Sequence, residues 1–219
     1  MSQIAFLFPG QGSQYVGMGK DLYQAFPEIS SLYEKANEVL GFDIAKISFE
    51  GPEEVLKQTQ YTQPAIFLHS IAVWKLMQKN GVKPTLVAGH SLGEYSALVC
   101  AGVLSFEEGL WAVGKRGLFM QKAGEENPGT MAAVVGMTTD ELFDLGKEVQ
   151  NLGIVQPANY NSKEQVAISG DFKAVEKAVE LAKAKGKKAI LLNVGGAFHS
   201  ALMISAKQNL EKALETVRF

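Results

Sequence analysis

Short apolar runs alternate with amphipathic stretches in the first half of the chain. Residues 4–8 form a continuous apolar run that stops at Pro9-Gly10, and residues 86–88 form a second run. Short apolar runs bounded by turn residues are typical of buried strands in a parallel sheet. Apolar side chains recur at helical spacing over 21–40 and 64–80, and a glycine follows each stretch. This alternation predicts an α/β domain.

From about residue 129 the pattern changes to short elements in the order βαββαβ, which is typical of a ferredoxin-like unit. The predicted strands are 131–135, 154–159, 166–169 and 189–194, and the predicted helices are 140–150 and 174–185. We therefore expect a large α/β-hydrolase-like domain with a parallel sheet, made of 1–129 and 197–219, and a ferredoxin-like subdomain of 130–196. The large domain would end in a helix over 202–217.

The pentapeptide Gly89-His90-Ser91-Leu92-Gly93 follows a predicted strand and precedes a predicted helix over 94–101. This G-x-S-x-G pattern between a strand and a helix indicates a nucleophilic serine on a sharp turn. The first N–H groups of the following helix would face the same point and could stabilise an oxyanion. The alternative is a connecting turn that happens to hold a serine, and the two flanking elements favour the nucleophile.

A nucleophilic serine needs a base, and the chain has three histidines, His69, His90 and His199. His69 lies inside a predicted helix, and His90 is adjacent to Ser91 and is expected to support the turn. His199 follows a predicted strand on a loop, where catalytic groups are often presented, and is the candidate base. Asp140 and Asp171 could complete a hydrolase triad, but both open predicted helices and are expected to be N-caps. A serine and histidine dyad is therefore favoured.

Composition and charge narrow the function classes. The net charge is −2 and the only lysine cluster, Lys183 to Lys188, is local, so the sequence does not indicate nucleic-acid binding. A single cysteine, Cys100, cannot form an internal disulfide and suits a reducing compartment. The first residues do not have the pattern of a signal peptide, and no apolar stretch is long enough to span a bilayer. These features predict a cytoplasmic protein that does not bind nucleic acid or membrane.

Six motifs together resemble one known family. They are Phe8-Pro9-Gly10-Gln11-Gly12-Ser13-Gln14, Thr62-Gln63-Pro64-Ala65, Gly89-His90-Ser91-Leu92-Gly93-Glu94-Tyr95, Lys115-Arg116-Gly117, Asn159-Tyr160-Asn161-Ser162 and Ala197-Phe198-His199-Ser200. In this order they resemble the malonyl-CoA:acyl-carrier-protein transacylases. The resemblance implies transfer of malonyl from a coenzyme A thioester, through an ester on Ser91, to the phosphopantetheine thiol of acyl carrier protein in fatty acid biosynthesis. It implies no cofactor and no metal.

The resemblance also assigns roles to individual residues. It gives Ser91 and His199 the roles inferred above, and it places the oxyanion donors on the backbone N–H groups of Gln11 and Leu92. Arg116 would hold the malonyl carboxylate, because a planar guanidinium can bind a carboxylate through two parallel hydrogen bonds. Further substrate-binding positions implied by the resemblance or by helical spacing from Arg116 are Met120, Asn161, Lys187 and Lys188.

Three alternatives stay open at this point: an acyltransferase of a polyketide synthase system, a serine thioester hydrolase, and a non-catalytic binding remnant. The resemblance further implies a segment beyond Phe219 that includes a glutamine whose backbone carbonyl orients the catalytic histidine. The sequence stops before any such group, and weak activity is the corresponding expectation.

Overall fold

The computed structural model describes residues 3–218 and divides into two compact units. The first unit is Met1–Leu118 with Leu210–Phe219, and the second is Phe119–Asn209. The predicted domain boundaries at 129/130 and 196/197 differ from these limits, and the outermost residues 1–2 and 219 of the predicted large domain lie outside the described residues. The predicted division stays a prediction.

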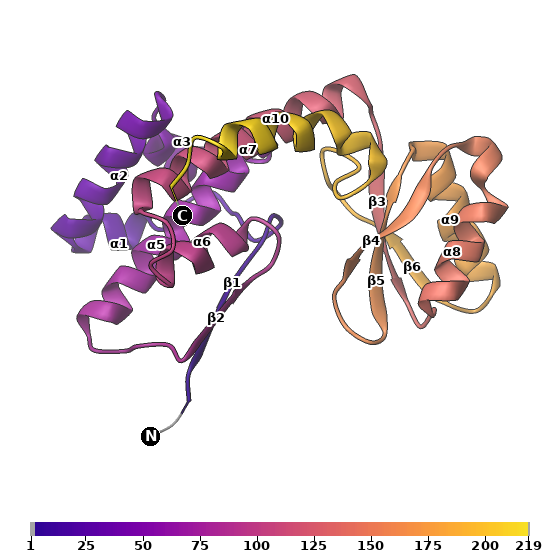
Figure 1. Cartoon of the computed structure of the whole chain (residues 1–219), viewed down its shortest axis with the longest axis horizontal. Coiled ribbons are helices and arrows are strands. Elements are labelled where there is room, and N and C mark those ends of the chain that lie inside the picture. Colours follow the sequence, from indigo (N-terminus) through magenta and orange to yellow (C-terminus); the bar gives the residue numbers. More distant parts are fainter. Residues whose placement is uncertain (1–2, 219) are drawn as a thin grey trace. The chain divides into compact units, whose positions relative to one another are not determined.

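The first unit contains a two-stranded parallel sheet of β1 (Ala5–Phe8) and β2 (Leu86–Gly89), shown in Figure 1. The strands are in register, with Ala5 opposite Leu86 and Phe8 opposite Gly89. Helix α6 (Gly93–Cys100) follows β2 almost at once and packs on both strands. Both strands therefore deliver their following loops to the same edge of the sheet.

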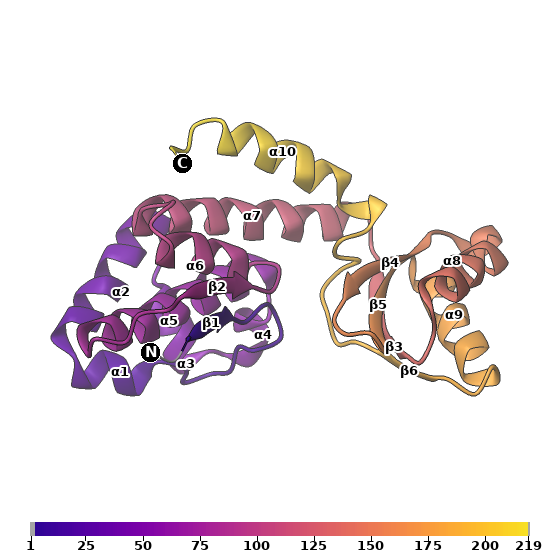
Figure 2. The ribbon, with the colours of Figure 1, turned by 60° about the horizontal axis from the view of Figure 1, so that its bottom comes forward.

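Besides α6 and the last residues of α10 (Ile204–Leu214), six helices contribute to the first unit, and all of them are visible in Figure 2. They are α1 (Lys20–Ala25), α2 (Pro27–Leu40), α3 (Ile44–Glu50), α4 (Glu53–Leu56), α5 (Thr59–Lys79) and α7 (Phe106–Glu126), whose last residues belong to the second unit. The buried core is centred on α5, where Phe67, Leu68 and Ile71 are fully buried.

Two proline effects correct the predicted helices of this unit. The single helix predicted over 21–40 is wrong: it is two helices that part at Phe26, which is extended with φ −128°. The ring of Pro27 disfavours helical backbone at the residue before it and itself suits the first turn of α2. The helix predicted over 64–80 begins earlier, at Thr59, so Pro64 lies inside α5, where the surrounding core holds the helix together despite one missing N–H.

The second unit is built on a four-stranded sheet in the order β4-β5-β3-β6, with every neighbouring pair antiparallel. Its strands are β3 (Thr130–Val135), β4 (Val155–Tyr160), β5 (Gln165–Gly170) and β6 (Lys188–Leu191). Helices α8 (Thr139–Glu148) and α9 (Phe172–Ala184) cover one face (Figure 1), and a short 3-10 helix η1 (Gln150–Leu152) follows α8. This order and pairing confirm the predicted ferredoxin-like arrangement, and with the parallel sheet of the first unit they confirm the fold class.

Helix ends in the second half of the chain differ from the predicted ones. The N-cap of α8 is Thr138, which forms a capping box with Glu141, so the prediction that Asp140 caps this helix was wrong. The helix predicted over 202–217 is a 3-10 turn η2 (Ala201–Met203) followed by α10 (Ile204–Leu214). A threonine hydroxyl that reaches the third backbone N–H outcompetes a carboxylate placed two residues further on.

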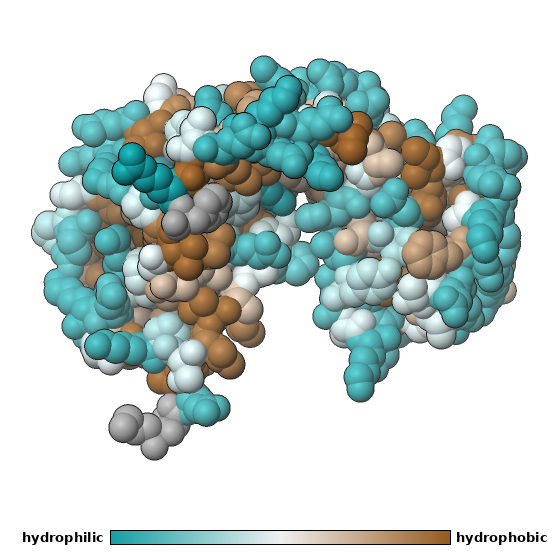
Figure 3. Space-filling model, viewed as in Figure 1, coloured by the Kyte–Doolittle hydropathy of each residue, from teal (hydrophilic) through white to brown (hydrophobic). Residues whose placement is uncertain are grey.

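Large apolar side chains are exposed on the parallel sheet. Leu7 is 78% exposed and Leu86 is 67% exposed, and Figure 3 shows hydrophobic surface over β1 and β2.

Among the described residues, no helix has the length and apolarity that crossing a bilayer requires.

Candidate active site

Ser91 sits on a sharp turn between β2 and α6. Its φ is 55°, in the left-handed region that is unfavourable for residues other than glycine. The two outer glycines of the motif are needed for this turn: a Cβ on Gly89 would lie 2.0 Å from the Gly93 carbonyl carbon, and a Cβ on Gly93 would lie 2.3 Å from the Phe8 oxygen. The strand, turn and helix expected around the candidate nucleophile are therefore present, and they hold Ser91 in a strained conformation.

The two predicted oxyanion residues lie on the two loops that leave this sheet edge. Leu92 is fully buried and is the N-cap of α6, and Gln11 follows β1. The loops are in contact, since the His90 N–H donates to the Phe8 oxygen at 3.0 Å and a Cβ on Gly10 would lie 2.7 Å from His90 Nδ1. His90 therefore lies against the neighbouring loop, in keeping with its expected support of the turn.

Arg116 comes from α7 and reaches the candidate nucleophile. Its Nη2 donates to Ser91 Oγ at 2.9 Å, and its Nη1 donates to Gln63 Oε1 at 2.6 Å. Burial lowers the pKa of the guanidinium from its ordinary value, while Tyr95 and Glu94 act in the opposite direction. Because an arginine titrates so far above neutral pH, the group stays charged. A cationic, planar donor therefore lies directly beside Ser91.

Gln63 is a site residue that the sequence analysis did not single out. It is 1% exposed in the buried part of α5, and its side-chain oxygen orients Arg116. On the same helix, Thr59 Oγ1 accepts from Gln11 Nε2 at 3.3 Å, so α5 touches both Arg116 and the loop after β1. The available signal was a glutamine inside the Thr62-Gln63-Pro64-Ala65 motif of an otherwise apolar helix.

His199 belongs to the second unit and is exposed between two buried neighbours. Phe198 packs in the apolar core of that unit, and Ser200 Oγ donates to the Ala197 oxygen at 2.6 Å. The φ of His199 is 59°, and within residues 3–218 it shares a positive φ only with Ser91 among residues other than glycine. Its anchored neighbours thus hold the imidazole on a strained, outward-facing turn.

The other predicted substrate-binding residues also lie in the second unit. Met120 is 8% exposed and belongs to its core. Asn161 Nδ2 donates to Gln165 Oε1 at 3.1 Å. Lys187 Nζ donates to the Gly136 oxygen and lies 4.0 Å from Glu141 Oε1, whereas Lys188 is exposed where β6 begins. The structure thus brings Gln11, Leu92, Ser91 and Arg116 to one sheet edge of the first unit, with the remaining candidates in the second.

Asp171 and His69 were the other residues considered for acid or base chemistry. Asp171 is the N-cap residue of α9, yet its carboxylate accepts from the Ile154 N–H at 2.6 Å and makes no cap bond to its own helix. His69 is half-buried on α5, and burial lowers its pKa from the ordinary value.

Within the described part of the chain, no three His, Cys, Asp or Glu side chains gather in a way that could hold a metal.

Comparison with known proteins gives a consistent set of relatives. Residues 5–219 match the protein family described as acyl transferase domain. "Malonyl CoA-acyl carrier protein transacylase" of Bacillus subtilis (strain 168) is 48% identical over 217 residues, which are 98% of this chain and 68% of the relative. The crystal structure of malonyl CoA-acyl carrier protein transacylase from Clostridium perfringens has a TM-score of 0.92 at 41% identity, covering 100% of this chain and 69% of that one. A malonyl-transacylase solved in complex with its type II PKS acyl-carrier protein has a TM-score of 0.93 at 44% identity, covering 100% and 70%.

Proposed function

Because this chain belongs to the acyl transferase domain family, we propose that it transfers a malonyl group from malonyl-CoA to the phosphopantetheine thiol of acyl carrier protein in fatty acid biosynthesis. One observation carries the proposal beyond the family: the guanidinium of Arg116 lies 2.9 Å from the hydroxyl of Ser91. A malonyl thioester has a carbonyl for a nucleophile and a carboxylate for a cation, and this pair supplies both. The named activity of the relatives supports the same assignment.

The proposed chemistry has two half-reactions. Ser91 Oγ attacks the malonyl thioester carbonyl while His199 takes its proton, and the N–H groups of Gln11 and Leu92 stabilise the oxyanion. The C–S bond then breaks, His199 returns the proton to the departing coenzyme A sulfur, and a malonyl ester remains on Ser91. The carrier-protein thiol next attacks this ester with His199 again as base, and the serine hydroxyl is regenerated with the proton that His199 gives back.

Arg116 gives the reaction its preference for malonyl over acetyl in this proposal. Gln63 accepts from one of the five N–H donors of Arg116 and Ser91 Oγ accepts from a second, while Gln63 fixes the plane of the guanidinium. The donor that reaches Ser91 Oγ would turn to the malonyl carboxylate as substrate enters. Release of the hydroxyl and capture of the carboxylate would then be the same event.

The remaining assignments belong to the same proposal. Met120 and Asn161 would contact the substrate, and Lys187 and Lys188 would face the phosphates of coenzyme A. The large α/β domain would comprise 1–129 and 197–219, with the ferredoxin-like subdomain at 130–196. The coenzyme A thioester substrate and the single Cys100 support a cytoplasmic location.

Intact mass spectrometry after exposure to malonyl-CoA tests the proposal. Wild type should gain one malonyl group, Ser91→Ala none, and His199→Ala should gain it much more slowly. Addition of acyl carrier protein with its phosphopantetheine arm should then discharge the ester and add malonyl to the carrier. Absence of any adduct on wild type, or an adduct that persists in Ser91→Ala, would rule out the mechanism, and rapid loss of malonate to water without an acceptor would indicate a thioester hydrolase.

Malonyl transfer in a polyketide system is the second candidate, and the relative solved with its type II PKS carrier protein supports it. The two candidates share all the chemistry and differ only in the carrier protein. Second-order rates of discharge of the Ser91 ester by a fatty-acid and by a polyketide carrier protein would separate them, because the cognate carrier should react faster.

A further inference from the structure

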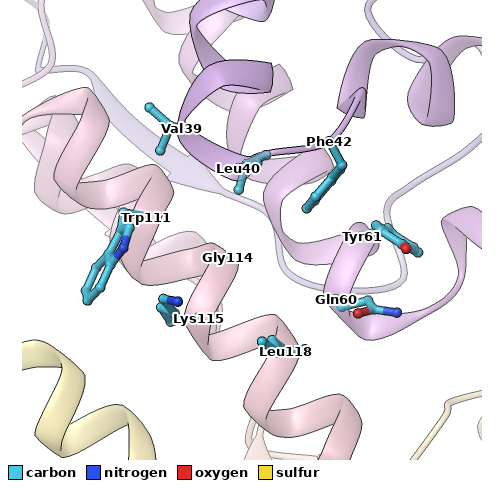
Figure 4. A pocket seen from close by; sticks show the side chains of 9 residues that line it. All are labelled: Val39, Leu40, Phe42, Gln60, Tyr61, Trp111, Gly114, Lys115 and Leu118. Atoms are coloured by element: carbon cyan, nitrogen blue, oxygen red, sulfur yellow. The ribbon is translucent and has the colours of Figure 1, made fainter.

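We propose that a groove between α2, α5 and α7 of the first unit binds a single saturated alkyl chain with an anionic head, that is, a medium-chain fatty carboxylate. The groove holds about 300 Å³, at the lower end of ordinary ligand pockets. It is separate from the malonyl site, because Arg116 turns toward Gln63 and Ser91, and neither of those residues lines the groove. Figure 4 shows the side chains around it.

The walls suit an alkyl chain. Trp111 and Leu118 mark the two ends along α7, a rise of roughly 10 Å, and Leu40, Phe42 and Tyr61 face them from the end of α2, the following loop and α5. Apart from Gln60 and Lys115, the side chains that line the groove are apolar or aromatic. A flexible chain can lie along such walls and remove apolar surface from water on both sides.

A glycine lines the groove where Leu40 packs against α7. Gly114 lies in the middle of α7, and a Cβ there would approach Leu40 Cδ2 to 2.9 Å. Alanine would favour the helix by roughly 1 kcal/mol over glycine at such a site. Gly114 therefore lets Leu40 pack closely against α7 at some expense to helix stability, and a larger side chain there would push Leu40 out of its place in the groove wall.

Lys115 gives the groove its charge. It is the single ionisable lysine or arginine among the described residues that line the groove, and no aspartate or glutamate lines it. Its Nζ lies 5.6 Å from the centre of the Trp111 ring, and within residues 3–218 it forms no ion pair. Lys115 is a half-buried lysine beside apolar walls, which suits a carboxylate attached to an alkyl chain and gives no advantage to a neutral or cationic ligand.

Fluorescence of Trp111 tests the proposal directly. The chain has two tryptophans, so Trp74→Phe leaves Trp111 as the reporter. Titration with decanoate, below its micelle concentration, should give a saturable one-to-one change. The neutral alcohol decanol, of the same chain length, should bind about tenfold more weakly, as expected for loss of one charge-assisted contact.

Variants in the same background locate the site. Lys115→Met should bind decanoate and decanol equally, Gly114→Leu should bind neither, and Lys122→Met, a control on the exposed part of the same helix, should behave as wild type. No saturable change, equal affinity of decanoate and decanol for the parent protein, or unchanged binding by Lys115→Met would overturn the proposal. The comparison of the two ligands needs no folding-sensitive variant. Decanoate binding by Ser91→Ala should equal that of the parent, so the result is independent of the acyl-transfer proposal.

Discussion

Replacement of Gln63 by methionine should lower malonyl transfer much more than acetyl transfer. Gln63→Met keeps the length and volume of the side chain but removes the oxygen that accepts from Arg116 Nη1 at 2.6 Å. Arg116 itself is untouched, and the change removes the contact that orients its guanidinium. Acetyl lacks the carboxylate that Arg116 is proposed to bind and serves as the internal comparison.

The expected size follows from the type of bond that is lost. A hydrogen bond to a charged group in a buried site contributes about 1.5–3 kcal/mol. If that contribution is needed to keep the guanidinium fork in place when the carboxylate binds, kcat/KM for malonyl-CoA should fall roughly 10- to 100-fold, since about 1.4 kcal/mol corresponds to a factor of ten. The value for acetyl-CoA should change less than about threefold.

The assay is the rate of formation of the Ser91 ester from each thioester, measured by rapid quench and intact mass. Gln78→Met, at the exposed end of the same helix, is the matched control and should leave both rates unchanged. Thermal unfolding of all three proteins separates a local effect from loss of folding, because Gln63 is buried. Equal losses for malonyl and acetyl in Gln63→Met would refute the assignment of Arg116 as the carboxylate-binding group.

Three further outcomes are expected. Ser91→Gly should be about 1 kcal/mol more stable than Ser91→Ala in urea unfolding, because glycine accepts the φ of 55° and alanine does not; the reverse order would contradict strain at the turn. Gly93→Ala should lower the unfolding free energy by more than about 3 kcal/mol, because its Cβ would meet backbone, whereas Gly102→Ala, with open space around it, should cost only about 1 kcal/mol. Burial lowers the pKa of His69, so the unfolded chain binds its proton first; melting temperature should fall as the pH drops below about 6.5, and less steeply in His69→Gln.

The sequence predicted the parts of the fold that follow from local pattern. Strand 86–88 and helix 94–101 were expected within a residue or two, because an apolar run and a glycine-bounded helix are local signals. The break at Phe26 was missed, although Pro27 is itself a local signal, because the apolar period continues across it. The early start of α5 was missed for the opposite reason: Thr59 and Thr62 are polar, and only tertiary packing buries them.

The sequence motifs suggested which residue types make up the candidate site, but not the hydrogen bonds that join residues far apart in the sequence. The G-x-S-x-G pattern indicates Ser91 as the candidate nucleophile because the motif and its flanking elements are contiguous in the sequence. Gln63 could not be found in this way, because its role depends on a contact with Arg116, 53 residues away. Hydrogen bonds between side chains far apart in the sequence leave no periodic pattern, so residues that support a site in this way are found only in the folded structure.

Backbone strain links the two proposed catalytic residues without reference to any motif. Ser91 and His199 lie in different units and on different local structures, one on a strand-to-helix turn and the other before a 3-10 turn, yet both have φ near +55° to +60°. A residue other than glycine in this region of backbone conformation is about 1–2 kcal/mol less stable than in the right-handed helical region. The packing around Ser91 and the packing around His199 must each offset this free energy. Buried neighbours do this in each case: Leu92 beside Ser91, and Phe198 and Ser200 beside His199. Because such strain persists where it fixes the direction of a reactive group, its presence at these two positions favours a functional role for each residue on grounds separate from the family resemblance.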